Sequence, residues 1–194
     1  FKTRTIWLEV LVAVDDDPAQ TWTRIATLNE VIEDYFGAHR PAGLIYPVSR
    51  IPNLDGIVEP QPRVVVGDGV DIERSGEIVD GFSTWAAFNR SGVREVMVSG
   101  IGGDDAGTIL GQIDGHIKSA GGQSLKENGI FNNAYIVAKD ESEASRQWLV
   151  DFNTSFTAYY EGVAPAGRTA QYVGGFVTPD YPCGINNRAV FALE

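Results

Sequence analysis

The first 36 residues constrain the fold most, because a strand pattern runs directly into a helix pattern. Residues Thr5 to Val14 alternate with a period of two and are largely apolar on both faces, which is typical of a strand in the middle of a sheet. Residues 18–36 then place apolar side chains at three- and four-residue steps, and Gly37 follows. This spacing predicts an amphipathic helix, so the chain is neither all-α nor all-β.

Three acidic residues, Asp15, Asp16 and Asp17, lie between the predicted strand and helix. They could form a calcium loop, although the EF-hand spacing and its distal Glu are missing. They could instead start the helix, with Asp17 as the N-cap and Pro18 in the first turn. Both interpretations stay open, and we favour the helix cap.

The segment from residue 41 to residue 62 contains five prolines, a density that forbids a helix. We therefore expect an extended, irregular excursion in which residues 44–46 form a short strand at most. A buried strand at residues 63–66 should follow, and then a hairpin that joins residues 70–74 to residues 77–79. Phe82, Trp85 and Phe88 are spaced by three, which favours one short helical turn.

A strand at residues 93–98 is followed by a second helical pattern that begins after Asp104 and Asp105, which we interpret as caps. Gly107, Gly111 and Gly115 recur every four residues along this helix. Each glycine costs up to about 1 kcal/mol relative to alanine in a helix. A glycine face allows another backbone to approach closely, so these three residues are candidate interface residues.

Residues 130–139 and 147–160 give the clearest β pattern in the whole chain, and we expect a long hairpin there. In its second arm the aromatic residues Trp148, Phe152 and Phe156 should share one face. An arm of this length extends beyond an ordinary strand and can pair with a neighbouring chain. These three aromatic residues are therefore further interface candidates.

The predicted fold class is α+β, with a mainly antiparallel sheet, two helices packed on it and the long hairpin in the C-terminal half. We expect one domain over residues 1–194, since a chain of this length buries a sufficient core without a second one. A Gly- and Pro-rich extension with short strands at residues 172–177 and 188–193 should occupy residues 163–194.

The composition argues against several kinds of chemistry. The net charge of −11 disfavours binding to nucleic acid, and the apolar runs are too short for a membrane span. With two His and one Cys, the chain offers no recognisable zinc cluster, cofactor motif or catalytic triad. Cys183 lies in a turn without basic neighbours, which predicts an inert thiol. We name no catalytic, metal or cofactor residue and expect a protein that is not an enzyme.

Three stretches are similar to parts of the tail-terminator and neck proteins of tailed bacteriophages. One is the Pro-rich link that enters the strand at residues 63–66. Residues 43–47 (GLIYP) follow the first helix as a similar segment does in those proteins. Residues 146–152 (RQWLVDF) resemble their late strand. The resemblance implies a structural virion subunit that forms a homo-oligomeric ring at the head–tail junction, with other tail or neck proteins as partners and no cofactor.

Two alternative functions remain. The first is a β-rich binding module, for example for carbohydrate, in which Trp85 and Tyr159 would stack on sugar rings. The second is a hydrolase with paired carboxylates, a class for which acidic residues suffice. Exposure of the aromatic residues separates the carbohydrate module from the virion subunit.

Overall fold

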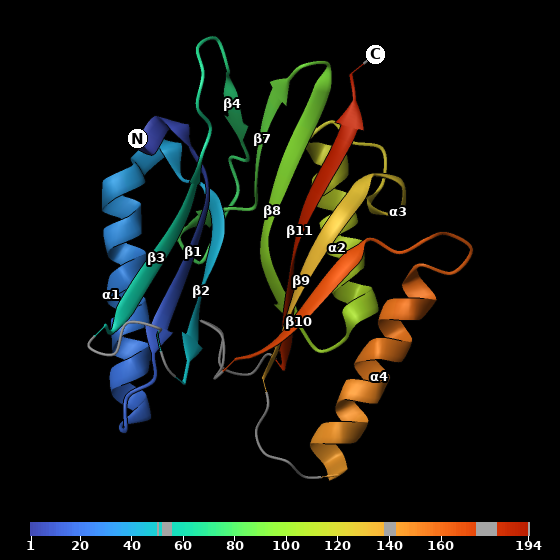
Figure 1. Cartoon of the computed structure of the whole chain (residues 1–194). Coiled ribbons are helices and arrows are strands. Elements are labelled where there is room, and N and C mark those ends of the chain that lie inside the picture. Colours follow the sequence, from blue (N-terminus) through green and yellow to red (C-terminus); the bar gives the residue numbers. More distant parts are fainter. Residues whose placement is uncertain (50, 52–55, 138–142, 174–181, 194) are drawn as a thin grey trace.

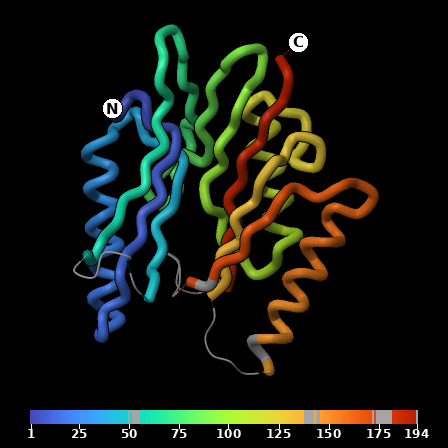
Figure 2. The backbone as a smooth tube through the Cα atoms, in the orientation of Figure 1, coloured from blue at the N-terminus to red at the C-terminus, as the bar shows by residue number. Residues whose placement is uncertain are grey.

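A computed structural model describes residues 1–49, 51, 56–137, 143–173 and 182–193 of the chain. Figure 1 shows four layers: helix α1, a three-stranded sheet, a six-stranded sheet, and helices α2 and α4. Both ends of the chain lie at the same end of the molecule (Figure 2). The predicted class, α+β with mainly antiparallel pairing, is confirmed.

The three-stranded sheet has the order β2-β1-β3. Its strands are β1 (Thr5–Ala13), β2 (Ala42–Val48) and β3 (Val58–Val64). Strand β1 pairs in parallel with β2 and antiparallel with β3. Leu8, Val10 and Val12 of β1 pack in one cluster with residues of α1, whereas Trp7 packs in the cluster between the two sheets. The prediction of a central strand buried on both faces is confirmed.

Helix α1 (Pro18–Phe36) has the predicted bounds and the predicted cap. The Asp17 carboxylate accepts a hydrogen bond from the Ala19 amide at 3.0 Å, with Pro18 in the first turn. Asp15 accepts a hydrogen bond from the Asp17 amide and forms an ion pair with Arg24 at 2.5 Å. Two of the three acids therefore have structural partners at the start of the helix. A 3-10 turn precedes β1 (Lys2–Arg4), and another follows α1 (Gly37–His39).

The six-stranded sheet has the order β10-β9-β11-β8-β7-β4. Its strands are β4 (Ile72–Arg74), β7 (Trp85–Arg90), β8 (Val93–Gly103), β9 (Gly129–Val137), β10 (Gly167–Val173) and β11 (Cys183–Ala192). All neighbours are antiparallel except β9 and β10. A separate small hairpin joins β5 (Ile78–Val79) to β6 (Phe82–Ser83).

Three helices belong to this second part of the chain: α2 (Ala106–Ser119), α3 (Leu125–Asn128) and α4 (Glu143–Tyr159). Asp105 caps α2 as predicted, by accepting hydrogen bonds from the amides of Gly107 and Thr108. The buried face of α2, with Ile109, Ile113 and Ile117, packs against one face of the six-stranded sheet. The three-stranded sheet covers the opposite face. None of the described helices is long and apolar enough to cross a membrane.

The expected long hairpin is wrong. Its first arm is strand β9, but residues 143–159 form helix α4. Trp148, Phe152, Phe156 and Tyr160 contact one another in succession, with ring centroids 5.6, 6.3 and 5.2 Å apart. A four-residue step keeps side chains on one face in a helix as well as in a strand, so these aromatics fit both structures. Val150 distinguishes the two structures. A strand would place it on the face of Trp148, two residues away, whereas it points away from this stripe and is 54% exposed.

The irregular Pro-rich excursion is also wrong, because most of the described residues between 42 and 64 belong to strands β2 and β3. Pro60 and Pro62 lie in β3, which is an edge strand of its sheet. Proline lacks a ladder donor and is tolerated at such an edge. The predicted buried strand at residues 63–66 is the end of β3 together with Val65, and Arg63 is exposed.

Three further local predictions need correction. Strand β4 pairs with β7 and β5 pairs with β6, so the two segments expected to form one hairpin do not pair. Phe82, Trp85 and Phe88 lie on strands β6 and β7, not on a helical turn. The C-terminal extension carries two strands of the sheet, and β11 is longer than the strand predicted at residues 188–193. Residues 138–139 of the expected long hairpin and residues 174–177 of the strand expected at 172–177 lie outside the described part of the chain.

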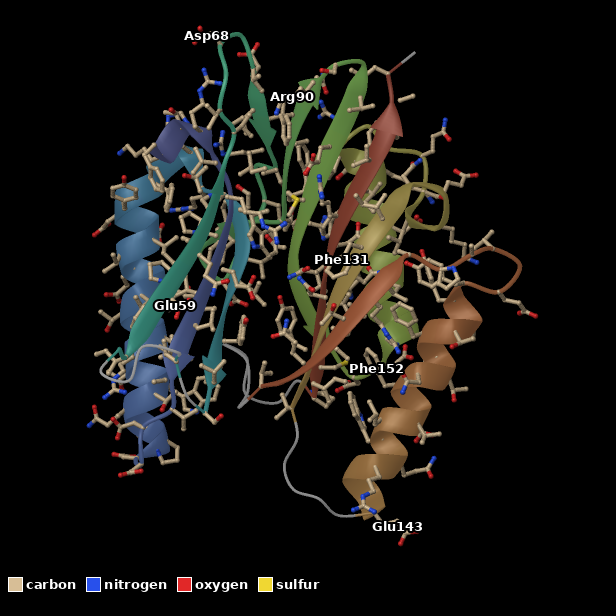
Figure 3. All side chains as sticks on the ribbon, viewed as in Figure 1. Glu59, Asp68, Arg90, Phe131, Glu143 and Phe152 are labelled. Carbon is tan, nitrogen blue, oxygen red and sulfur yellow. The ribbon has the colours of Figure 1, made fainter. Side chains whose placement is uncertain are left out.

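Side chains from both sheets fill the space between them (Figure 3). The contact is mostly apolar, but it includes the buried carboxylate of Glu9. The hydroxyl groups of Tyr46 and Tyr135 donate hydrogen bonds to this carboxylate at 2.5 and 3.3 Å. Asn186 donates in turn to the Tyr135 hydroxyl at 2.8 Å. These hydrogen bonds join the three-stranded sheet to β9 and β11, so the two sheets share one core.

Candidate functional site

The candidate site is a cavity of about 460 Å³ beside the free end of strand β8. Strand β7 pairs with β8 only as far as the pair Trp85 and Val98. Beyond that pair, no described strand is hydrogen-bonded to residues 100–103 of β8 on the side of β7. Strand β2 approaches this segment from the other sheet, and the cavity lies between the two sheets, the β5–β6 hairpin and helix α2.

A glycine and a serine hold the two sheets together at this cavity. The Ser99 hydroxyl accepts a hydrogen bond from the Gly43 amide at 2.9 Å and donates one to the Ser83 carbonyl at 2.5 Å. A Cβ atom on Gly43 would lie 2.0 Å from the carbonyl oxygen of Leu8. Only glycine therefore fits on β2 at this point. Ser99 is fully used in joining β2, β6 and β8, which explains its presence without any chemical role.

The β5–β6 hairpin forms another wall of the cavity. Its two-residue turn is Asp80 and Gly81, with φ angles of 50° and 81°. These positive angles and the Asp-Gly sequence are typical of a type I′ turn. The turn places Asp80 in the cavity wall, and partial burial raises the pKa of its carboxyl group. Glu77, just before β5, is a second acidic residue in the wall.

Helix α2 contributes Gln112 and His116, which are four residues apart and so lie on the same face of the helix. Burial lowers the pKa of His116, and the negative charge of Glu77 partly offsets this effect. The imidazole is consequently neutral at pH 7 and can accept or donate a hydrogen bond.

Thr84 supplies the most informative polar group. Its side chain lines the cavity and is only 4% exposed, and its hydroxyl makes no hydrogen bond to any described residue. Its backbone is fully engaged, since the amide donates to the Glu77 carbonyl and the carbonyl accepts from the Ser99 amide. A buried hydroxyl without a partner costs about 1–3 kcal/mol. A group bound in the cavity would give this hydroxyl a partner if it reached the oxygen.

The rest of the wall is largely apolar and includes Leu44, Phe82 and Ile101. The wall thus combines apolar surface with several polar groups, as small-molecule sites do. The Ser99 hydroxyl is used structurally, and Cys183 is buried with the pKa of its thiol raised to about 12. The arrangement supports binding better than covalent chemistry.

The predicted glycine interface lies outside this cavity. Gly107 faces helix α4, where its amide donates to the Ser155 hydroxyl at 3.0 Å, so its close approach occurs within the chain. Gly111 and Gly115 are exposed, and a Cβ atom on either would meet no atom within 4 Å. A contact between these two residues and a second chain stays a prediction.

The predicted aromatic interface residues belong to the core of the chain itself. Phe152 and Phe156 are 3% and 5% exposed, and Trp148 packs against the same cluster. Figure 3 shows Phe152 on the side of α4 that faces the six-stranded sheet. The guanidinium group of Arg168, on β10, lies 4.5 Å from the centre of the Phe156 ring. No free aromatic arm projects from residues 143–160.

Burial also weighs against the carbohydrate module. Trp85 and Tyr159 are both partly buried and packed against the core cluster of the six-stranded sheet. Lys126 lies over the Tyr159 ring at 5.2 Å. Neither residue offers the open ring face that sugar stacking needs, so this interpretation is not supported.

The residues that line the cavity were not identified from the sequence. Glu77, Asp80 and Thr84 lie within eight residues of one another, but nothing in the sequence connects them with His116, which stands alone on its helix. The one available signal was the Asp80-Gly81 pair, which predicts a two-residue hairpin turn. Within the described residues, no group of three or more His, Cys, Asp and Glu side chains could hold a metal ion.

Only the comparison with solved structures found similar proteins. No protein-family model matches the chain, and no curated protein sequence does. Similar solved structures include a YjgF family member from Neisseria meningitidis, with 18% identity and a TM-score of 0.49 over 64% of this chain and 98% of that one. A YjgF/YER057c/UK114 family member from Mycobacterium tuberculosis has 17% identity and a TM-score of 0.48 over 62% of this chain and 100% of that one. RidA from the Antarctic bacterium Psychrobacter has 19% identity and a TM-score of 0.45 over 61% of this chain and 94% of that one.

The resemblance to phage tail terminators is therefore wrong. The similar structures are YjgF, UK114 and RidA proteins instead of tail or neck proteins. The segment 146–152, which was compared with a late strand of tail terminators, is helical. The virion location, the ring at the head–tail junction and the tail and neck partners are withdrawn together with this resemblance.

Proposed function

We propose that the chain binds a small organic molecule in the cavity between its two sheets. The observation that carries this proposal is Thr84, a residue of the cavity wall whose buried hydroxyl lacks a partner among the described residues. The apolar wall would hold the body of the ligand, and Thr84 and His116 would bond its polar group. A volume of about 460 Å³ suits such a ligand.

The cavity would bind its ligand without forming a covalent bond to it. Ser99 is occupied by two hydrogen bonds, and the pKa of the Cys183 thiol is raised by burial. Neither is an activated nucleophile, since activation needs a lowered pKa or an adjacent base. His116 then serves as a hydrogen-bonding group for the ligand.

The two histidines provide a direct test by NMR of their ring protons. His116 lines the cavity, whereas His39 is exposed and does not line it. Benzyl alcohol, benzylamine and benzoate are suitable probes, because each joins an apolar ring to one polar group. At least one should shift the His116 signals in a saturable way and leave those of His39 unchanged. If none of the three does so, the proposal is wrong.

Replacement of Thr84 by valine tests the role of the orphan hydroxyl. Thr84→Val removes an unbonded polar group while keeping the side-chain shape, so the free energy of unfolding should rise by about 1 kcal/mol. Affinity for the probe should fall at least fivefold, and Thr84→Ser should restore it. Stability is measured by urea unfolding and affinity by the titration of the His116 signals.

The matched control is Thr21→Val. Thr21 is also buried, but its hydroxyl accepts a hydrogen bond from the Asp15 amide at 2.9 Å. Its loss should lower the free energy of unfolding by about 1 kcal/mol and leave probe affinity unchanged. A destabilised Thr84→Val protein with normal affinity would assign Thr84 a structural role and contradict the proposal.

We also propose that the chain associates with copies of itself, and the observation that favours this is the edge strand β10. Residues 167–171 of β10 are exposed along one side of the sheet. They include no proline, whereas the edge strand β3 contains Pro60 and Pro62. An exposed edge without proline is a template for pairing with another strand. A second copy of β10 would supply that strand.

A further inference from the structure

The charges around the cavity restrict the chemistry of its ligand, and this inference rests on the proposed binding function. The ionisable side chains in the wall are those of Glu77, Asp80 and His116. No Lys or Arg is among the described residues that line the cavity. An anionic ligand would therefore meet two carboxyl groups without a compensating cation.

The placement of the two acids strengthens this argument. Asp80 is fixed by its two-residue turn, and Gly81 in the same turn packs against Asn29 of helix α1. This contact keeps Asp80 beside the cavity, where part of its surface stays in solvent. Glu77 is held close by, because its carbonyl accepts the hydrogen bond from the Thr84 amide at 3.1 Å. The acids and the orphan hydroxyl consequently lie on one connected stretch of wall.

Asp80 keeps much of its surface in solvent, but partial desolvation raises the pKa of its carboxyl group. A cation that enters the cavity would favour the charged carboxylate. The chain itself carries a net charge of −11, which attracts cations to its surface. Leu44, Phe82 and Ile101 would contact an apolar group attached to the cation.

We infer that the cavity selects a small amphipathic cation, such as an organic amine with an apolar body. The ammonium group would lie between Glu77 and Asp80 and donate a hydrogen bond to the Thr84 hydroxyl. The neutral imidazole of His116 would accept another. An ammonium group has three donors and no acceptor, which matches these acceptors.

The test compares benzylamine with benzyl alcohol and benzoate, which share the ring and differ in charge. Affinities are measured by titration of the His116 ring signals at pH 7.5. Benzylamine should bind at least tenfold more tightly than benzyl alcohol, and benzoate should bind more weakly than the alcohol. If the alcohol or benzoate binds as tightly as the amine, the cation inference is wrong while the binding function stands. If none of the three shifts the signals of His116, both are wrong.

A double variant, Glu77→Gln with Asp80→Asn, isolates the contribution of the two acids. Asparagine tolerates the left-handed conformation, so the type I′ turn should persist. Benzylamine affinity should fall at least tenfold, and benzyl alcohol affinity should change less than twofold. The control, Asp68→Asn with Glu127→Gln, makes the same change in net charge at exposed residues that do not line the cavity. Equal losses in both double variants would show a general charge effect and overturn the inference.

Discussion

His116 links the candidate site to pH. Burial lowers its pKa in the folded chain, so the unfolded chain takes up a proton more readily. The stability that depends on the neutral imidazole is present above the unfolded pKa of about 6.5 and is lost as the pH falls through that value. Glu77, Asp80 and Gln112 are the polar neighbours in the cavity wall.

We therefore expect the free energy of unfolding to decrease between pH 7.5 and pH 5.5, measured by urea unfolding. His116→Gln should make this decrease smaller, because glutamine does not titrate. His39→Gln is the control and should keep the wild-type slope, since His39 is exposed. An unchanged slope in the His116→Gln protein would contradict the account of its burial.

Single residues were predictable from the sequence where their role is local. Asp17 and Asp105 both cap helices as predicted, because a cap depends on a side chain and amides two or three residues away. Thr84 was not predictable in this way. Its hydroxyl is buried by segments that come together only in the fold, and the sequence around Thr84 does not predict that burial.

At the scale of elements, the contact between helices α2 and α4 depends on one carboxylate. Asp105 accepts hydrogen bonds from the amides of Gly107 and Thr108, and the Ser155 hydroxyl of α4 donates to it as well. These donors lower the pKa of Asp105. The side chain therefore caps one helix and fixes the other against it.

Asp105→Ala should lower the free energy of unfolding by about 2 kcal/mol, the upper end for loss of a helix cap. Asp104→Ala is the matched control. Asp104 is exposed and adjacent, and its loss should change the free energy of unfolding by less than about 0.5 kcal/mol. Urea unfolding of both variants measures the difference, and equal effects would refute the capping role of Asp105.

The elements themselves were predicted with uneven success, for physical reasons. Helix α1 has apolar residues at helical spacing only, and β1 is a short run rich in Val and Ile that ends at three acids and a proline, so both were predicted correctly. Helix α4 was taken for a strand because its aromatic residues recur every four positions, a spacing that both structures place on one face. Strand β3 was missed because Pro60 and Pro62 argue against a strand, although an edge strand accepts them.

The whole molecule shows why the cavity could not be foreseen. Its wall comes from β2, the β5–β6 hairpin, the end of β8 and helix α2, which are brought together only by the stacking of two sheets. Gly43 is required where β2 lies against β1 and the β5–β6 hairpin, because a Cβ atom there would clash with the Leu8 carbonyl and the Phe82 ring. The composition predicted an acidic chain, but only the fold shows that two of the acids line one cavity.

Self-association belongs to this scale and is tested by light scattering over a range of concentrations. We expect the mass to rise to a multiple of the monomer mass, because β10 leaves an edge that another copy can extend. Ala170→Lys, at an exposed position of β10, should shift the equilibrium toward the monomer. A wild-type chain that keeps the monomer mass at every concentration would exclude the association.

The position of β11 has a consequence for synthesis on the ribosome. Strand β11 lies between β8 and β9, in the middle of the six-stranded sheet (Figure 1). Until residues 183–192 have been made, β8 with its neighbours and β9 with β10 are two separate halves that expose the edges β11 will join. Synthesis adds about 5–20 residues per second, so a hundred residues take about 5–20 seconds. During this time the exposed edges must not pair with other strands. A chaperone that shields open strand edges during translation would help this protein more than one that acts after release.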